Sequence, residues 1–369
     1  MPETITAAVA ASPGAEFALE QLELEDPRPN EVLVRIEAAG ICHTDLTCRD
    51  GLLPTPQPVV LGHEGAGVVE RVGSAVQGLS EGDRVGLSFN SCGACANCMS
   101  GRPAYCLEFW ARNFDASRPD GTTALSRNGE SLHSHFFGQS SFATHAVVPE
   151  RAAVKAPDRI PFEVLAPFGC GIQTGAGAVM NVLRPGSTDP LAVFGLGGVG
   201  MAAVMAAKVV GCQTIIGVDL NPARLELGQE LGVTHPIDAG DQDPIEEVRR
   251  ITGAGAPFAL EMSGSTKALR QAIDCLAPAG VCGVIGAPPG GTEGSFDVNE
   301  LIALGRTIRG MVEGDSVPAV FIPKLISLWE RGVFPVDRLV ETFPFDQINE
   351  AAARAKSGEV IKPVLRVGS

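Results

Sequence analysis

The sequence predicts an α/β protein with a β-rich, barrel-like domain and a second domain built on a doubly wound parallel sheet. Three observations indicate this class. The first third reads as short strands and tight turns, strands and helices alternate from about Leu191, and a glycine-rich fingerprint joins the first strand of that alternation to its first helix. A chain of 369 residues is long enough for two domains with ample cores.

The β-rich region is predicted from alternation and turn residues. Glu31–Ala38 alternates charged or polar residues with apolar ones, as a half-buried strand does. Val68–Val72 and Arg84–Leu87 are further predicted strands, separated by turns such as Glu81–Asp83. This pattern favours an antiparallel, barrel-like domain.

The parallel sheet is predicted from short apolar runs that alternate with helical patterns such as Pro222–Leu231. The predicted strands of this sheet are Leu191–Phe194, Thr214–Val218, Phe258–Met262 and Val281–Ile285. Such alternation is typical of βαβ units. The tail predicts two amphipathic helices, Val317–Gly332 and Phe345–Gly358, and a last strand, Val360–Val367.

Composition excludes several classes of function. A net charge of −15 argues against nucleic-acid binding and against adsorption to anionic lipid. The longest nearly uncharged stretch, Leu191–Ala207, is broken by four glycines and followed by Lys208, so we expect no membrane span. Met1–Ala15 lacks the basic start and apolar core of a secretory signal. Ten cysteines then indicate a reducing, cytoplasmic location in which thiols are free for metal.

Four cysteines form one cluster with the spacing C-x2-C-x2-C-x7-C. They are Cys92, Cys95, Cys98 and Cys106. This spacing predicts a closed, structural zinc site with four thiolate ligands. Two disulfides are the alternative and would need an oxidising compartment. Three thiols two residues apart suit a metal better than paired bridges.

A dinucleotide fingerprint follows the first strand of the predicted parallel sheet. Leu191–Gly200 reads LAVFGLGGVG and contains G-x-G-x-x-G at Gly195, Gly197 and Gly200. The three glycines permit the tight turn, the approach of backbone to the pyrophosphate, and helix–strand packing. Asp219 ends the second strand 19 positions after Gly200, where a carboxylate would hold the ribose 2′-hydroxyl of NAD and repel the 2′-phosphate of NADP.

A second set of soft ligands is dispersed along the chain as Cys42, His63 and Cys170. Two thiolates and one imidazole with an open fourth position are one of the ligand sets of catalytic zinc. Each residue alone reads as an ordinary buried side chain. Their presence beside a cysteine cage and a nucleotide fingerprint favours a zinc enzyme.

These motifs together resemble the zinc-dependent medium-chain alcohol dehydrogenases over essentially the full chain. The matching segments are Gly62–Gly67 (G-H-E-x-x-G), the cysteine cage, Gly169–Gly175 (GCGIQTG), Gly195–Gly200 and, more weakly, Ser357-Gly358 with Ile361-Lys362. Gly169–Val179 and Phe136–Phe142 look most like the aryl- or benzyl-alcohol dehydrogenase branch. The resemblance implies a GroES-like barrel domain (1–171 with 311–369) around an inserted Rossmann domain (172–310), the medium-chain dehydrogenase/reductase architecture.

The resemblance also implies roles for individual residues. Cys42, His63 and Cys170 would bind the catalytic zinc, Asp45 would orient His63, Glu64 would bind the metal transiently, and Thr44 would take the substrate's hydroxyl proton. His43 and Lys362 fall where the family binds pyrophosphate, and Arg224 falls near the adenosine ribose. The remaining cofactor-binding positions are Thr174, Gly195, Leu196, Gly197, Gly198, Val199, Gly200 and Asp219. The substrate pocket would be lined by Leu53, Phe136, Phe137, Ile172 and Val312.

One position departs from the family pattern. Many members carry a relay histidine five residues after the first zinc cysteine, and here that position is Thr47. The last step of proton transfer to solvent would therefore use water or the hydroxyl of Thr47.

The function that these expectations predict is reversible oxidation of a primary alcohol, aryl or allylic, to its aldehyde, with NAD and two zinc ions per subunit. A glutathione-dependent formaldehyde dehydrogenase and a non-catalytic NAD(P)-binding relative are the alternatives. The partner would be a small alcohol or aldehyde. The family implies a homodimer or homotetramer joined through the edges of the parallel sheets, with Thr307–Gly310 as the expected edge strand.

Overall fold

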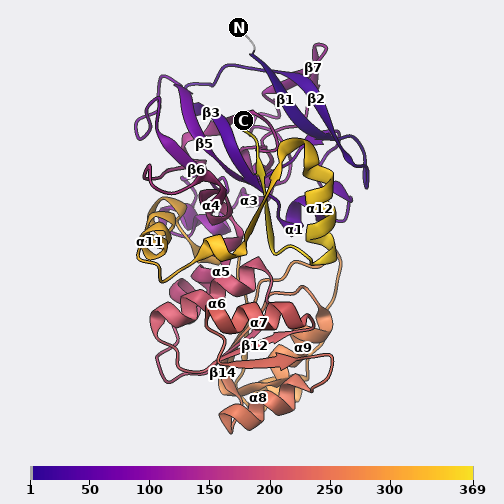
Figure 1. The fold of residues 1–369 in the computed structure, drawn as a ribbon, viewed down its shortest axis with the longest axis vertical. Helices are drawn as coiled ribbons and strands as arrows, with labels where there is room; N and C mark the ends of the chain where they lie inside the picture. Colours follow the sequence, from indigo (N-terminus) through magenta and orange to yellow (C-terminus); the bar gives the residue numbers. More distant parts are fainter. Residues whose placement is uncertain (1–2, 369) are drawn as a thin grey trace. The chain divides into compact units, whose positions relative to one another are not determined.

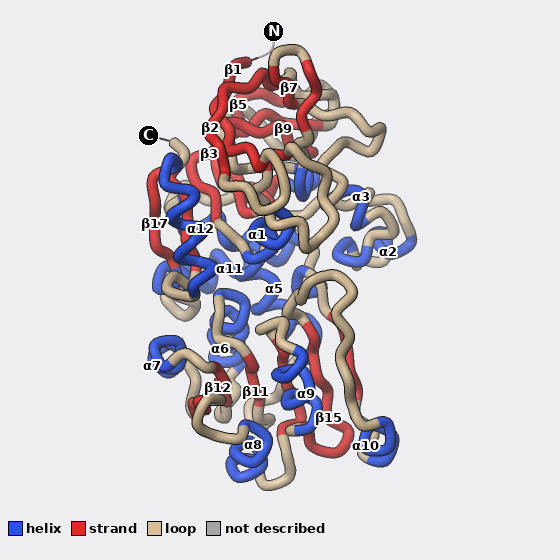
Figure 2. Tube along the Cα trace, turned by 90° about the vertical axis from the view of Figure 1, so that its right-hand side faces the viewer, coloured by secondary structure: helices blue, strands red, loops and turns tan. Residues whose placement is uncertain are grey.

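The computed structural model describes residues 3–368, which fall into two compact units. The first unit comprises the chain up to Cys170, Val317–Glu330 and the tail from Val336, and the second comprises Gly171–Ser316 with Arg331–Pro335. Figures 1 and 2 show the β-rich elements of the first unit and the strand–helix alternation of the second. The chain therefore leaves the first unit and returns to it.

The first unit is built on two sheets. A five-stranded sheet has the order β4-β1-β2-β7-β8, and a seven-stranded sheet has the order β10-β6-β5-β3-β18-β17 with β9 also paired to β3. The strands are β1 Glu3–Ala10, β2 Phe17–Leu24, β3 Glu31–Gly40, β4 Val59–Val60, β5 Glu64–Val72, β6 Arg84–Leu87, β7 Leu125–Arg127, β8 Glu130–Leu132, β9 His145–Pro149, β10 Ala153–Lys155, β17 Val340–Pro344 and β18 Lys362–Arg366. The prediction of a β-rich domain is confirmed.

The longest strand, β3, joins distant parts of the chain. It pairs antiparallel with β5, β9 and β18. Val364 of β18 stands opposite Gly40, so the tail completes the sheet that begins near the N-terminus. Figure 1 shows helix α12 (Ile348–Ser357) beside these C-terminal strands. The helices of this unit are α1 His43–Arg49, α2 Ala96–Met99, α3 Phe109–Asn113, α4 Phe162–Leu165, α11 Pro318–Glu330 and α12.

The second unit carries a six-stranded parallel sheet with the order β13-β12-β11-β14-β15-β16. The strands are β11 Leu191–Phe194, β12 Ile215–Asp219, β13 His235–Asp238, β14 Ala256–Glu261, β15 Leu276–Val284 and β16 Thr307–Gly310. The helices are α5 Gly171–Gly177, α6 Gly198–Val210, α7 Pro222–Leu231, α8 Pro244–Thr252, α9 Thr266–Asp274 and α10 Val298–Ala303. The strand order reverses between β11 and β14, which confirms the doubly wound sheet and marks the crevice where such sheets bind ligands.

Local sequence explains where the helices of this sheet begin. The side chain of Asn221 accepts from the N–H of Ala223, and Pro222 occupies the first turn of α7. Asp243 caps α8 in the same way, through the N–H of Ile245. Gly211 ends α6 at φ +90°, a conformation that glycine adopts without strain. These signals are local, and the predicted helix Pro222–Leu231 has the bounds observed for α7.

Among residues 3–368, no helix combines the length and the apolar character needed to span a membrane.

Candidate active site and metal centres

Three separate segments bring two thiols and an imidazole together in the first unit. Cys42 precedes α1, His63 precedes β5, and Cys170 follows the short helical segment Ala166–Gly169. Together with Glu64, they place four ligand atoms within 4.8 Å of one another. The structure therefore brings together the three residues expected to hold the catalytic metal.

Asp45 fixes this group through three hydrogen bonds. Its Oδ2 accepts from the N–H of Cys42 at 2.9 Å, and its Oδ1 accepts from the N–H of Gly62 at 3.1 Å. Oδ1 also lies 2.8 Å from Nδ1 of His63. Because a carboxylate can only accept, Nδ1 carries the proton and the Nε2 lone pair is left for a metal.

The Nε2 atom of His63 tests whether this group fits a metal. It is buried and has no hydrogen-bond partner within residues 3–368, a costly state for a polar atom. Phe137 stacks on the imidazole ring at 4.5 Å, and Phe136 meets it edge-on at 5.6 Å. A zinc ion bound by this nitrogen and two thiolates would remove the cost, so the residues fit the metal.

The Cys42 thiol favours the form that binds metal. The Cys170 thiol lowers the pKa of Cys42 well below its usual value, although burial alone would raise it. Thiolate is the form that coordinates zinc. Thr44, on the first turn of α1, places its Oγ1 3.9 Å from the Cys42 sulfur.

Glu64 and Lys362 form a buried ion pair beside the thiols. The Nζ atom of Lys362 lies 2.9 and 2.7 Å from the two carboxylate oxygens of Glu64. The side chains are 5% and 0% exposed. Burial alone would lower the pKa of Lys362, but the carboxylate of Glu64 raises it, so the ammonium form is maintained. The structure thus gives Lys362 a protein partner, and its expected contact with coenzyme phosphate stays a prediction.

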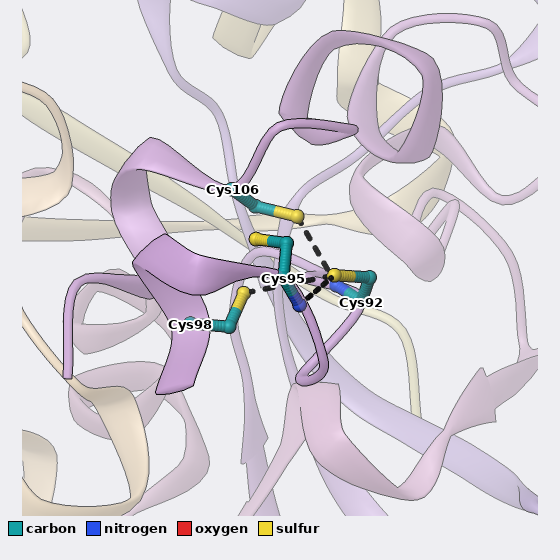
Figure 3. A group of neighbouring side chains, drawn as sticks. All are labelled: Cys92, Cys95, Cys98 and Cys106. Atoms are coloured by element: carbon teal, nitrogen blue, oxygen red, sulfur yellow. Dashed lines mark hydrogen bonds between the residues drawn. The ribbon is translucent and has the colours of Figure 1, made fainter. Parts of the chain in front are cut away.

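The four clustered cysteines point toward a common centre (Figure 3). Their sulfur atoms all lie within 4.8 Å of one another, and those of Cys92 and Cys98 are 3.8 Å apart. Four sulfurs at about 2.3 Å from one ion would stand about 3.8 Å apart. A disulfide would bring two sulfurs to about 2 Å, and all four thiols are free. The geometry fits a closed zinc site and excludes the disulfide alternative.

Backbone amides prepare this cage for negative charge. The sulfur of Cys92 accepts from the N–H groups of Ala94 and Cys95, at 3.4 and 3.2 Å. The sulfur of Cys106 accepts from Cys92 and Glu108, at 3.3 and 3.4 Å. Such donors stabilise thiolates, the form in which cysteine binds zinc.

The glycine fingerprint in the second unit adopts the conformation that dinucleotides require. Gly195 has φ +92°, and a Cβ on Gly200 would lie 1.9 Å from the carbonyl oxygen of Gly195. Around Gly197, which caps α6, a Cβ would meet nothing within 4 Å. The open space thus lies at a helix N-terminus, where free N–H groups bind an anion. This cradle fits a pyrophosphate.

Asp219 folds back onto the fingerprint. Its Oδ2 accepts from the N–H of Leu196 at 2.7 Å, and its Oδ1 accepts from Leu220 and Asn221 at 2.8 and 2.9 Å. The carboxylate at the end of β12 is therefore fixed beside the glycine loop that precedes α6. Gly198 and Val199 begin that helix.

The other expected coenzyme residues lie in both units. His43 is exposed on α1 in the first unit. In the second unit, Arg224 lies on α7, and Thr174 on α5 has its hydroxyl 3.4 Å from Glu313.

The residues expected to line the substrate pocket are also divided between the units. Leu53, Phe136 and Phe137 belong to the first unit, and Ile172 and Val312 to the second. Phe136 is 0% exposed and Phe137 4% exposed. Both rings contact the imidazole of His63, and both also belong to an aromatic cluster with Phe114.

Two side chains have roles that sequence reasoning missed or left open. Gln139, 1% exposed, donates to the carbonyl of His63 at 2.9 Å and accepts from the N–H of Gly65 at 3.0 Å. No local signal distinguishes this glutamine. Thr47 donates its hydroxyl to the carbonyl of His43 within α1, at 2.8 Å. That hydroxyl proton is therefore committed to the helix.

Comparison with known proteins gives consistent matches. The sequence model described as alcohol dehydrogenase GroES-like domain matches residues 28–158, and the one described as zinc-binding dehydrogenase matches residues 198–330. A geraniol dehydrogenase from Castellaniella defragrans is 45% identical over 361 residues, which are 97% of this chain and 96% of that protein.

Two solved structures are similar over their whole length. An alcohol dehydrogenase zinc-binding domain protein from Burkholderia ambifaria is 52% identical, with a TM-score of 0.98 and full coverage of both chains. Benzyl alcohol dehydrogenase from Acinetobacter calcoaceticus is 46% identical, with a TM-score of 0.96 and coverage of 99% of this chain and 100% of the other. With the metal groups and the nucleotide fold already described, these matches show that the chain is an oxidoreductase and belongs to the zinc-binding alcohol dehydrogenase family.

Proposed function

We propose that this enzyme oxidises aryl or allylic primary alcohols reversibly to aldehydes, with NAD as hydride acceptor. The observation that carries the proposal is the group of Cys42, His63 and Cys170, in which the buried imidazole Nε2 has no hydrogen-bond partner within the described residues. The relatives named for geraniol and benzyl alcohol support an alcohol whose hydroxyl carbon is next to a double bond or a ring.

Asp45 and Thr44 each have a defined task in this chemistry. When bound, zinc polarises the alcohol oxygen and nicotinamide takes the hydride. Asp45 holds the proton on Nδ1 of His63 and keeps that ring oriented. Thr44, whose hydroxyl is near the Cys42 sulfur, would accept the proton of the alcohol while its own hydroxyl proton passes outward through the ribose of the bound coenzyme.

The preference for NAD is supported by Asp219. Its carboxylate accepts from the N–H of Leu196, which fixes a negative charge beside the phosphate-binding loop. A ribose 2′-hydroxyl can donate to such a carboxylate, whereas a 2′-phosphate would be repelled.

Two zinc ions per subunit, a homo-oligomer and a cytoplasmic location complete the proposal. The two separate ligand groups support the metal count, and the ten free thiols support a reducing compartment. The end position of β16 in its sheet leaves one strand edge available for a second copy.

A substrate panel tests the proposal directly. The rate of coenzyme reduction is measured for benzyl alcohol, cinnamyl alcohol, geraniol, ethanol and hydroxymethylglutathione, each with NAD and with NADP. We expect the highest kcat/KM for the aryl and allylic alcohols with NAD. A higher kcat/KM for ethanol contradicts the substrate class, and preference for hydroxymethylglutathione favours a formaldehyde dehydrogenase.

A further inference from the structure

A close backbone contact brings the segment of Cys170 to that of His63. Gly169 directly precedes Cys170. A Cβ on this glycine would lie 1.9 Å from the carbonyl oxygen of Leu87 and 3.7 Å from that of His63. Leu87 is the last residue of β6, and His63 directly precedes β5. Because β5 and β6 pair antiparallel, the two ligand segments meet at the same end of one sheet.

The side-chain amide of Gln139 connects the two strands at this end. Its Nε2 donates to the carbonyl of His63 at 2.9 Å and to the carbonyl of Ser88 at 3.2 Å. Its Oε1 accepts from the N–H of Gly65 at 3.0 Å. Two carbonyls on one side and an N–H on the other determine the orientation of the amide. Gln139 therefore joins the start of β5 to the residue that follows β6.

The hydroxyl of Ser88 continues this connection to the segment of Cys170. Its Oγ donates to the carbonyl of Gly169 at 2.7 Å. Ser88 is 0% exposed and Gln139 is 1% exposed, so loss of either side chain would take a donor from a buried backbone carbonyl, which is costly. One continuous chain of hydrogen bonds therefore runs from the carbonyl of His63, through Gln139 and Ser88, to the residue before Cys170.

We propose that Gln139 and Ser88 are positioning residues of the open metal group, whose chain of hydrogen bonds sets the separation of the ligand atoms of His63 and Cys170. The inference rests on the proposed zinc alcohol dehydrogenase function and deepens it. Asp45 orients the imidazole, whereas Gln139 and Ser88 place the second thiolate beside it. Ligands bind a metal most tightly when the residues behind them hold them in place. Loss of the chain should therefore weaken metal binding at the open group and leave the cage unchanged.

Cobalt binding tests this inference. Full-length protein that keeps zinc in the cage is loaded with cobalt at the open group. Competition with a chelator measures the cobalt affinity, and the sulfur-to-cobalt absorption reports how the thiolates bind the ion. We expect Ser88→Ala to bind cobalt about tenfold more weakly than wild type, as is usual for residues behind a metal ligand. The absorption per bound cobalt should also fall, because the sulfur of Cys170 is less well placed.

Two further variants separate positioning from general damage. Gln139→Met keeps a side chain of similar length without its hydrogen bonds, and it should weaken cobalt binding at least as much as Ser88→Ala. If this variant does not fold, Ser88→Ala decides alone. Ser141→Ala is the matched control, because the hydroxyl of Ser141 is also buried but has no hydrogen-bond partner within residues 3–368. Its loss should leave cobalt affinity and absorption unchanged.

The outcomes distinguish this inference from the proposed function. Unchanged cobalt affinity in Ser88→Ala overturns the inference, as does an equal loss in Ser141→Ala. Weaker binding with unchanged sulfur-to-cobalt absorption also overturns it, since Cys170 would then bind as in wild type. Failure of wild type to bind cobalt at the open group, or of the zinc enzyme to oxidise any alcohol, contradicts the proposed function instead.

Discussion

The two metal groups of this protein are assembled in opposite ways. The cage uses four cysteines from one segment of 15 residues, Cys92 to Cys106. The open group draws Cys42, His63 and Cys170 from three distant segments, and Asp45 joins the first two of these segments. A local set of four thiolates closes around an ion, whereas the dispersed set leaves one position for chemistry. Damage to the first should therefore affect stability, and damage to the second should affect activity.

Removal of a ligand from the open group should have the largest effect on catalysis. We expect Cys170→Ser to lower kcat/KM by at least about a thousandfold, because metal polarisation contributes several kcal/mol. Metal analysis should find one zinc per subunit. Cys48→Ala, which alters a buried cysteine outside both groups, should retain two. Retention of two zinc ions by Cys170→Ser would contradict the assigned ligand set.

Removal of a ligand from the cage should destabilise the protein before it affects the reaction. We expect Cys98→Ser to lower the melting temperature by about 10 °C or more, because a structural zinc ion contributes its binding energy to folding. At low temperature, kcat per folded subunit should remain within about threefold of wild type, since no cage residue belongs to the open group. A large loss of kcat with an unchanged melting temperature would reverse the roles assigned to the two groups.

The residue that orients the open group should have an intermediate effect. Asp45→Asn can still accept from one backbone N–H but cannot hold the proton of His63 in the same way. We expect a loss of about 10- to 100-fold in zinc affinity or kcat/KM, as is usual for residues behind a metal ligand. Competition with a chelator measures the affinity, and an unchanged value would show that Cys42 and Cys170 suffice.

The last prediction concerns a buried polar cluster of the first unit. None of the residues in this cluster belongs to either metal group. His135 is 3% exposed and lies 3.8 Å from Glu31, which Arg118 also contacts. Burial, followed by the charge of Arg118, lowers the pKa of His135 to about 4. The unfolded chain binds this proton near pH 6.5, so folding stability should fall as pH drops from about 6.5 to 4. The loss from this group is about 3 kcal/mol at most.

His135→Asn isolates that contribution, because asparagine tolerates the left-handed backbone at φ +66°. Denaturant unfolding of both proteins at pH 7 and pH 5 should show a shallower pH dependence for the variant. Parallel curves for the two proteins would remove His135 from the acid sensitivity of the fold.

Sequence reasoning predicted those features that depend on spacing within a short segment. The cysteine cage, the glycine fingerprint and the helix Pro222–Leu231 lie within such segments, and the structure shows each in the expected form. It could not predict contacts between remote residues. Gln139 bonds the backbone on both sides of Glu64 from 74 and 76 positions away, and Lys362 reaches Glu64 across 298 positions. Such pairs are set by the register of the sheets, which no local pattern specifies.

The three hydrogen bonds of Asp45 also have a consequence for how the enzyme acquires its metal. Because Cys42, Gly62 and His63 are all tied to one carboxylate, the imidazole is oriented before any ion arrives. Loading of the open group should then require little rearrangement of the chain, and newly synthesised protein could take up zinc there in a single rapid step. The two ends of the cage loop are joined through a ligand sulfur, since the sulfur of Cys106 accepts from the N–H of Cys92, so folding of this loop and its metal uptake should proceed together.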